Sequence, residues 1–250
     1  MHIRRVVLHN IRAFQEASLD LCPDGRGFSG WAVITGDNGA GKTALLRAIA
    51  LAVLGPDQAR PLLQDPSGWV HADADSGTIS VEIRPHNEFD RTQRGGAPYK
   101  GTFWAEIEIA REDESWVIDQ VDLYRRKQKG ATNGPWPEAT PGWFIAGYGP
   151  FRRFYGMSQD ASRVMFGQGR GPRFATLFME GATLGEGEEW IRKLEFARLD
   201  FEYRRKTEKE IDARILRNLL TLVEADFLRN GVRIEDIDSS AIWLRDAAHY

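Results

Sequence analysis

The sequence predicts an α/β fold, and three observations support this prediction. The first is a short apolar run at residues 31–35, which has the length and composition of a buried strand. The second is a glycine-rich segment at residues 36–43, directly followed by an apolar, helix-like segment at residues 44–54. The third is a set of later segments in which apolar and polar residues alternate. A strand, a glycine-rich loop and a helix in this order are the framework of phosphate-binding α/β domains.

The glycine-rich segment matches the phosphate-loop pattern G-x-x-x-x-G-K-S/T at every position. Glycine adopts backbone angles that other residues avoid, so the N–H groups of such a loop can turn inward around a phosphate, beside the positive end of the following helix. In this pattern Lys42 is expected to contact the β- and γ-phosphates, and the Thr43 hydroxyl is expected to bind Mg²⁺. The absence of an N-K-x-D-like guanine motif favours ATP over GTP. The predicted phosphate-binding residues are Gly36, Asp37, Asn38, Gly39, Ala40, Gly41, Lys42 and Thr43.

Strand patterns occur on both sides of the loop. They cover residues 3–8, 17–21, 78–84, 103–110 and 116–124. The last three alternate apolar and polar side chains with a period of two, which is typical of half-buried antiparallel strands. A further apolar run at residues 143–148 is expected to form a buried strand. The sequence therefore predicts a mixed sheet that contains antiparallel strands.

After residue 150 the pattern becomes helical. We expect a nucleotide-binding lobe at residues 1–150 and a helical lobe at residues 151–250. Apolar residues follow a helical spacing within residues 188–201 and again within residues 211–227, and ordinary core packing explains both stripes. The basic residues of this half alternate with glutamates, so a salt-bridged surface is favoured over a nucleic-acid face.

The overall composition narrows the classes of function. The net charge is −3, so a contact with DNA would have to come from a local patch. No apolar span reaches 18 residues, and no membrane-spanning helix is expected. Cys22 is the only cysteine, which excludes an intrachain disulfide and favours the reducing cytoplasm. The five histidines are scattered without the spacing of metal ligands.

The N-terminal part of the chain combines several motifs in one order. A first strand is followed by the turn Asn10-Ile11-Arg12-Ala13-Phe14, a second strand, and a phosphate loop that carries Asn38 before its middle glycine. This order resembles the opening of an ABC-type ATPase head, in the group of AAA ATPases that includes RecF, SMC and OLD-like proteins. Residues 145–153 and 188–191 resemble the subgroup that contains OLD-family proteins and Septu-type (PtuA-like) defence ATPases.

The resemblance implies a two-lobed head that dimerises around Mg-ATP and gates a DNA-repair or anti-phage defence assembly. It implies that Lys42 and Thr43 are phosphate and magnesium ligands, and that Arg12 and Phe14 lie near the nucleotide base or ribose. In such heads one subunit presents the phosphate loop and a Walker B acid, and the other presents an LSGG-like signature. A nuclease or effector chain is a further implied partner, and DNA is implied as a possible partner through a local patch.

Two motifs of this family have no clear counterpart here. A Walker B strand needs apolar residues followed by Asp-Glu, and neither residues 116–119 nor residues 242–246 fit. Residues 184–188 resemble the LSGGE signature but lack its serine. The chain therefore resembles the N-terminal half of a head, and its catalytic residues stay unassigned. Three alternatives remain open: an ATPase completed by further sequence of its own, a split head completed by another chain, or a non-hydrolysing, ATP-sensing module that recruits a nuclease or effector.

Overall fold

The structure is a computed structural model of the 250-residue chain. It describes residues 1–22, 30–63, 65–98, 100–121, 129–150, 158–165, 167–183, 191, 192, 195, 196, 199, 210–223, 225, 232–238 and 242–245. The chain divides into two compact units. One contains Met1–Arg152 and Met157–Ala182, and the other contains Arg153–Gly156 and Thr183–Tyr250. The two lobes expected from the sequence stay a prediction.

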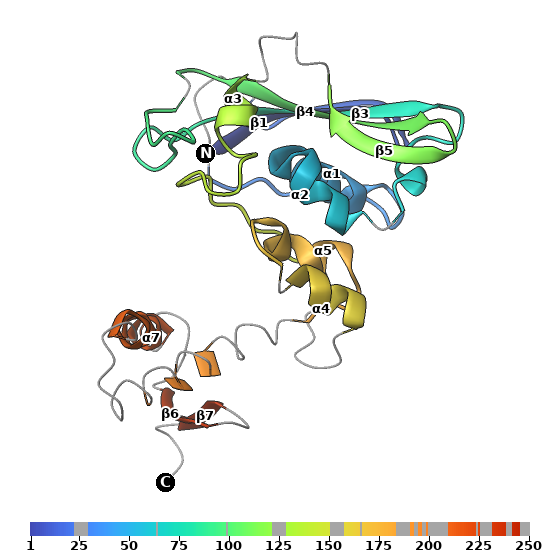
Figure 1. Ribbon diagram of the computed structural model, residues 1–250. Coiled ribbons are helices and arrows are strands. Elements are labelled where there is room, and N and C mark those ends of the chain that lie inside the picture. The colour runs from blue at the N-terminus through green and yellow to red at the C-terminus, as the bar shows by residue number, and fades with distance from the viewer. Residues whose placement is uncertain are drawn as a thin grey trace. The chain divides into compact units, whose positions relative to one another are not determined.

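The first unit is built on a five-stranded antiparallel sheet (Figure 1). Its strands are β1 (His2–Ile11), β2 (Phe14–Asp20), β3 (Ser76–Arg84), β4 (Phe103–Glu112) and β5 (Ser115–Gln120), in the order β2-β1-β3-β4-β5. These strands confirm the segments predicted at residues 3–8, 17–21, 78–84 and 103–110, and β5 confirms the first part of the segment predicted at residues 116–124. Every strand pair that the described residues form is antiparallel.

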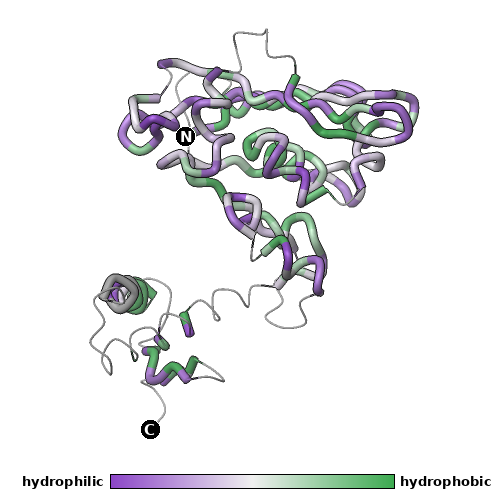
Figure 2. The backbone as a smooth tube through the Cα atoms, in the orientation of Figure 1, coloured by the Kyte–Doolittle hydropathy of each residue, from purple (hydrophilic) through white to green (hydrophobic). Residues whose placement is uncertain are grey.

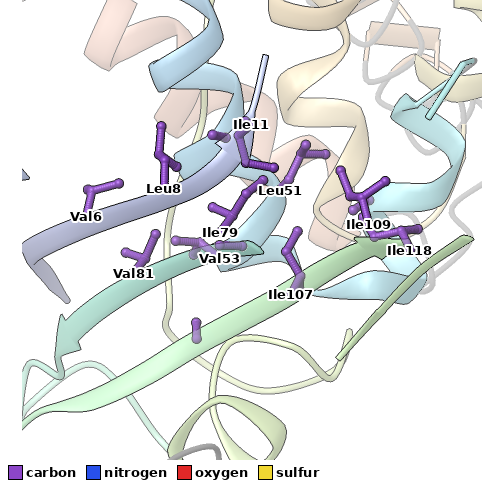
Figure 3. Packing of buried hydrophobic residues seen from close by; sticks show 14 of the residues in the cluster. Val6, Leu8, Ile11, Leu51, Val53, Ile79, Val81, Ile107, Ile109 and Ile118 are labelled. Carbon is purple, nitrogen blue, oxygen red and sulfur yellow. The ribbon is translucent and has the colours of Figure 1, made fainter. Parts of the chain in front are cut away.

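Helix α1 (Lys42–Leu54) packs against one face of this sheet and confirms the helix predicted after the loop. Because strand side chains alternate between the two faces, every second residue of β1, β3 and β4 contributes to one core. Figure 3 shows Leu51 and Val53 of α1 among Val6, Leu8, Ile79, Val81 and Ile107. Figure 2 shows the same alternation as changes between hydrophobic and hydrophilic colouring along the strands. Burying α1 in this way fixes the position of its first turn.

Short helices complete the first unit. They are α2 (Pro56–Ala59), η1 (Arg60–Leu62), η2 (Ser67–Trp69), α3 (Lys129–Asn133), α4 (Gln159–Met165), η4 (Gly171–Phe174) and α5 (Ala175–Phe178). The buried Arg170 precedes η4 and holds the segment that follows α3, because its guanidinium donates to the carbonyl oxygens of Pro135, Pro137 and Thr140. Burial lowers the pKa of Arg170, as does the nearby charge of Arg173.

Two predicted strands are not strands in the structure. Residues 31–35 and 143–148 have no strand assignment, although both carry the apolar residues that predicted one. Trp31 and Val33 are 89% and 83% exposed, and Phe144 and Tyr148 are 76% and 64% exposed. A strand exists only when its N–H and C=O groups pair with a neighbouring strand, and the described residues form no such ladder beside either segment. The prediction that these runs are buried strands is therefore wrong for this chain.

The segment at residues 143–148 is instead held by side chains and single hydrogen bonds. Trp143 is buried, and its backbone N–H donates to Asp90 Oδ1 at 2.8 Å. Its indole N–H donates to the carbonyl oxygen of Arg91 at 2.6 Å. Further along, the N–H of Gly147 donates to the carbonyl oxygen of Arg173 at 3.1 Å. The segment is anchored at both ends while its apolar side chains at Phe144 and Tyr148 face solvent.

The second unit contains α7 (Glu210–Leu222) and the hairpin β6 (Arg233–Ile237) and β7 (Ile242–Arg245). Leu216 of α7 and Ile237 of β6 form its small described core. The helix α7 covers the first part of residues 211–227, where a helical stripe was expected. The part of the chain expected to form a helical lobe also contains this hairpin, whose Ile234, Ile237 and Ile242 belong to the same apolar cluster as Leu216. Most of the helix expected within residues 188–201 lies outside the described residues. Among the residues described, none of the helices has the length and apolar character needed to cross a membrane.

Candidate nucleotide-binding site

The chain turns sharply at the start of α1. Gly39 and Gly41 have φ angles of +84° and +87°, in the left-handed region that favours glycine. Gly41 caps the helix, and its carbonyl oxygen accepts the first intrahelical bond, from the N–H of Leu45 at 2.8 Å. The N–H groups of a helix's first turn have no intrahelical acceptor. Here they belong to Lys42, Thr43 and Ala44, so three backbone donors and the positive end of the helix dipole lie at one place.

These three residues line a cavity of about 630 Å³. The full lining is Arg12, Ala13, Asn38, Gly39, Gly41, Lys42, Thr43, Ala44, Gly68 and Val70. The lining includes two basic side chains, and within the described part of the chain it includes no aspartate or glutamate. The cavity therefore combines positive charge with free backbone donors, which is the combination that attracts an anion.

The structure brings six of the ten predicted site residues into this lining: Arg12, Asn38, Gly39, Gly41, Lys42 and Thr43. The other four are not part of the lining. Gly36 and Asp37 offer their carbonyl oxygens to Lys42 Nζ, at 2.7 and 2.6 Å. Ala40 donates its N–H to the carbonyl oxygen of Asp37 at 3.2 Å, which closes the loop. Phe14 is not among the lining residues, and its ring packs against Gly41.

The contact between Phe14 and Gly41 is very close. A Cβ atom at Gly41 would lie 2.5 Å from the Cζ atom of Phe14. The β1–β2 turn can approach the start of α1 to this distance only because residue 41 has no side chain. This contact makes Phe14 a support of the loop rather than a lining residue.

The lining also contains four residues that were not expected from the sequence: Ala13, Ala44, Gly68 and Val70. Gly68 and Val70 lie at the cavity because two segments that are far apart in the sequence pair with each other. Ile11 forms an isolated antiparallel bridge with Val70, and the N–H of Arg12 donates to the carbonyl oxygen of Trp69 at 2.8 Å. No local pattern in residues 65–70 signals this pairing, because it depends on tertiary contact.

Arg12 is held over the cavity by Trp69. Its φ angle is +52°, which is uncommon for a residue with a side chain. The hydrogen bond to the Trp69 carbonyl fixes its backbone, and its guanidinium lies 4.7 Å from the centre of the buried Trp69 ring. Such a cation–π contact orients a guanidinium without neutralising its charge. The Arg12 side chain is thus directed by two contacts with a single residue.

The same stack continues away from the cavity. The ring of Trp69 stacks on Phe178, with centroids 6.2 Å apart, and Arg47 of α1 lies 5.7 Å from the centre of the Phe178 ring. Arg47 Nε donates to the carbonyl oxygen of Leu177 at 2.7 Å. Burial lowers the pKa of Arg47, and the positive charge of Arg12 lowers it further. Two guanidiniums with two aromatic rings between them therefore connect the cavity wall to α5.

With this geometry in place, comparison with known families identifies the class of protein. A family model described as an AAA domain matches residues 5–226, and the chain belongs to this family. The α/β phosphate-loop NTPase fold and the resemblance to the RecF/SMC-like AAA ATPases, both expected from the sequence, are confirmed.

Individual relatives agree with this assignment. The chain is 33% identical over 106 residues to the DNA replication and repair protein RecF of Xanthomonas oryzae pv. oryzae (strain MAFF 311018), covering 42% of this chain and 27% of that protein. RecF of Xanthomonas axonopodis pv. citri (strain 306) matches over the same length with the same identity, covering 26% of that protein. The Septu protein PtuA of Bacillus mycoides (strain KBAB4) is 24% identical over 82 residues, covering 32% of this chain and 12% of that protein. The matched region thus spans about a quarter or less of each relative.

The close approach at Gly41 gives a testable prediction. Gly39→Ala should lower the free energy of unfolding by about 1 kcal/mol, because only its backbone is strained and nothing lies within 4 Å of the new methyl. Gly41→Ala should cost at least about 1 kcal/mol more, because the methyl also meets the Phe14 ring. Chemical denaturation of both variants measures the difference.

A Phe14→Ala background serves as the control. In that background, the loss of unfolding free energy caused by Gly41→Ala should equal the loss caused by Gly39→Ala, since the Phe14 ring is absent. Equal costs for both glycine variants in the wild-type background would show that the Phe14 contact does not constrain the loop.

Proposed function

We propose that the protein is the Mg-ATP-binding part of an ATPase head, which dimerises around ATP and gates a DNA-repair or anti-phage defence assembly in the cytoplasm. The observation that carries this proposal is the cavity at the start of α1. There, Lys42, the first-turn N–H groups of α1 and Arg12 gather around a space lined by no described carboxylate. Membership of the AAA domain family and similarity to proteins named RecF and PtuA support the biological context.

Phosphate binding follows from the charges and donors of the loop. The Lys42 ammonium contacts two neutral carbonyl oxygens, those of Gly36 and Asp37, so its positive charge is not cancelled by a carboxylate there. Lysine binds phosphate as a compact point charge, and backbone N–H groups at a helix start add directed donors. The triphosphate is expected to lie between Lys42 and the N–H groups of Thr43 and Ala44.

Thr43 fits the role of a magnesium ligand. Its side chain is exposed and lines the cavity at the first turn of α1, and its hydroxyl has no hydrogen-bond partner among the described residues. Mg²⁺ takes oxygen ligands and keeps several waters, so one protein hydroxyl beside phosphate oxygens suffices. When bound in such a loop, the ion bridges β- and γ-phosphate oxygens and neutralises their charge.

Arg12 is placed to contact the rest of the nucleotide. It lines the cavity together with Gly68 and Val70, on the wall contributed by the β1–β2 turn and residues 68–70. Its guanidinium is directed by Trp69, as described above. We expect this wall to contact the ribose or the adenine base, while the loop holds the phosphates.

Exposed apolar residues support an assembly with further polypeptide. Residues 31–35 lead directly into the phosphate loop, and they present Trp31 and Val33 to solvent. Residues 143–148 do the same with Phe144 and Tyr148. A segment with large exposed apolar side chains is the kind of surface that another strand or subunit covers. We infer that a second copy of this chain, or the remaining part of a head, covers these segments.

The second candidate function is a non-hydrolysing, ATP-sensing module that recruits a nuclease or effector chain. The same cavity supports it, because no carboxylate of the described residues lines the cavity to activate a water. The two candidates share nucleotide binding and differ in turnover after assembly.

Nucleotide binding can be tested at Lys42. Lys42→Ala should weaken Mg-ATP binding about 10- to 100-fold, because a charge-assisted contact to the phosphates is lost. Titration calorimetry on the purified chain measures the affinity. Lys129→Ala, which removes an exposed lysine on α3, should leave the affinity unchanged. Unchanged binding in the Lys42 variant would rule out the loop as the phosphate site.

The positioning of Arg12 can be tested at Trp69. Trp69→Leu should weaken ATP binding about threefold to tenfold, because the Arg12 guanidinium loses the ring that orients it. Affinity for inorganic tripolyphosphate, which has neither base nor ribose, should stay unchanged. Trp136→Leu is the matched control, since Trp136 donates to Ala52 near the other end of α1. An equal loss for ATP and tripolyphosphate would show that Trp69 acts only through the stability of the fold.

A further inference from the structure

Strand β5 is the outermost strand on one side of the five-stranded sheet (Figure 1). It pairs with β4, and no strand of the described residues pairs with its other side. The carbonyl oxygen of Ile118 accepts a hydrogen bond from Arg60 NH2 at 3.2 Å, and the N–H of Gln120 donates to Asp119 Oδ1 at 2.7 Å. Alternate residues of β5 therefore direct their backbone groups away from β4, as the open edge of an antiparallel ladder does.

A cavity of about 260 Å³ lies along this edge. Residues 116–119 of β5 line it, together with Arg60, Leu63, Pro66 and Glu112. Neighbouring side chains of a strand point to opposite faces, so a cavity that touches four consecutive residues lies against the edge of the strand. Most of this lining is apolar, including Trp116 and the buried Ile118. This space, which we call the Trp116 cavity, suits an apolar side chain.

A second cavity of about 300 Å³ begins at Asp119 and Gln120, roughly two residues further along β5. We call it the Trp136 cavity. The Trp136 ring is fixed there, because its indole N–H donates to the carbonyl oxygen of Ala52 at 2.9 Å and its ring lies against Gly55, where a Cβ atom would be 2.6 Å from Trp136 Cγ. The carboxylates of Asp57 and Asp119 line the same space. A fixed indole beside carboxylates suits the cationic side chain of lysine or arginine.

The charges along the edge decide between two kinds of occupant. The two linings hold three carboxylates, those of Asp57, Glu112 and Asp119, and Arg60 is their only basic side chain among the described residues. A second copy that paired through its own β5 would bring equivalent carboxylates together, and like charges that face each other across two strands are destabilising. A basic partner complements the same charges.

We propose that the edge of β5 is a docking site for an extended, basic peptide segment of another protein, which adds a strand to the sheet. In strand addition the main-chain hydrogen bonds supply affinity, and pockets for alternate side chains supply specificity. The segment places an apolar side chain in the Trp116 cavity and a lysine or arginine side chain in the Trp136 cavity. Side chains two residues apart lie on one face of a strand, about 7 Å from each other, which matches the offset of the two cavities along β5.

Arg60 competes with such a segment. Its guanidinium holds the Ile118 carbonyl oxygen, which an added strand needs as an acceptor, and its side chain is 52% exposed. The same guanidinium pairs with Asp57 at 2.7 Å and offsets part of the negative charge of the Trp136 cavity. Arg60 thus covers the edge when no peptide is bound, as charged side chains on other edge strands do.

The Trp136 cavity is separate from the nucleotide site. It is lined by Leu54 and Gly55 at the C-terminal end of α1, whereas Lys42 and Thr43 lie at the N-terminal end. Twelve residues of helix span about 18 Å. Peptide docking can therefore be measured without involving the phosphate loop.

The probe is a fluorescein-labelled octapeptide in which threonine alternates with valine, with one valine changed to leucine and the next to lysine. It is made with leucine and lysine in both orders, because an edge strand accepts parallel or antiparallel neighbours. Fluorescence anisotropy with the purified chain measures the affinity. One order should bind, and changing its lysine to glutamate should weaken binding about tenfold, since the glutamate would face Asp57 and Asp119.

N-methylation of the bound peptide, one residue at a time, tests for strand addition. Every second N–H of an added antiparallel strand faces its neighbour, and an added parallel strand likewise bonds through alternate residues. Methylation should therefore weaken binding at alternate positions and have little effect at the positions between them.

Protein variants test the charges at the edge. Asp57→Asn/Asp119→Asn should bind the lysine peptide about threefold to tenfold more weakly, because two exposed charge contacts are lost. Glu88→Gln/Asp160→Asn removes two exposed carboxylates elsewhere and should bind as the wild type does. Arg60→Met keeps an apolar stem but frees the Ile118 carbonyl oxygen, and it should bind about threefold more tightly. Melting temperature and Mg-ATP affinity, measured on the same samples, should stay unchanged.

Four results would overturn the proposal: no binding of either peptide order, equal binding of the lysine and glutamate peptides, N-methyl effects without alternation, or equal losses in the two double variants. Sedimentation of the peptide-free chain gives a fifth. If Asp57→Asn/Asp119→Asn changes the oligomeric state while peptide affinity stays the same, the edge of β5 belongs to a second copy of the chain.

Discussion

The contact between the Phe14 ring and the bare backbone of Gly41 is the constraint on which the candidate site depends. It brings the β1–β2 turn against the start of α1, and residue 41 must be glycine both for its positive φ angle and for this approach. Once the turn is there, Arg12 reaches Trp69, Ile11 pairs with Val70, and residues 68–70 become the second wall of the cavity. The burial of α1 under the sheet fixes the other wall (Figure 3).

The sequence was sufficient to predict the parts of the fold that are encoded locally. Local sequence patterns predict three of these parts: the phosphate loop from the glycine spacing of residues 36–43, the helix from the apolar run after it, and the strands from alternating apolar and polar residues. Gly68, Val70 and Trp69 were missed because their place in the site comes from pairing across almost sixty residues of sequence. The prediction of strands at residues 31–35 and 143–148 was wrong because strand formation also depends on tertiary contact. Their composition fits a strand, but a strand also needs a neighbour, and composition says nothing about whether the neighbour is present.

The candidate nucleotide-binding site and the exposed apolar segments at residues 31–35 and 143–148 are connected by the backbone and by side-chain contacts. Residues 31–35 run into the phosphate loop, and residues 143–148 are fixed by Asp90 and by the backbone of η4. The stack from Arg12 through Trp69 and Phe178 to Arg47 joins the cavity wall to α5, which follows η4. A polypeptide that covers residues 31–35 would therefore lie beside the loop that we propose to hold the phosphates.

The most direct test of this account is phosphate release from Mg-ATP by the purified 250-residue chain, measured beside its Lys42→Ala variant and on samples whose ATP binding has been established. The account predicts that the wild type binds ATP and releases no more phosphate than the variant, since the described lining of the cavity holds no acid to activate water. Turnover by the wild type that disappears in the variant would contradict it. That result would place a catalytic acid within residues 1–250.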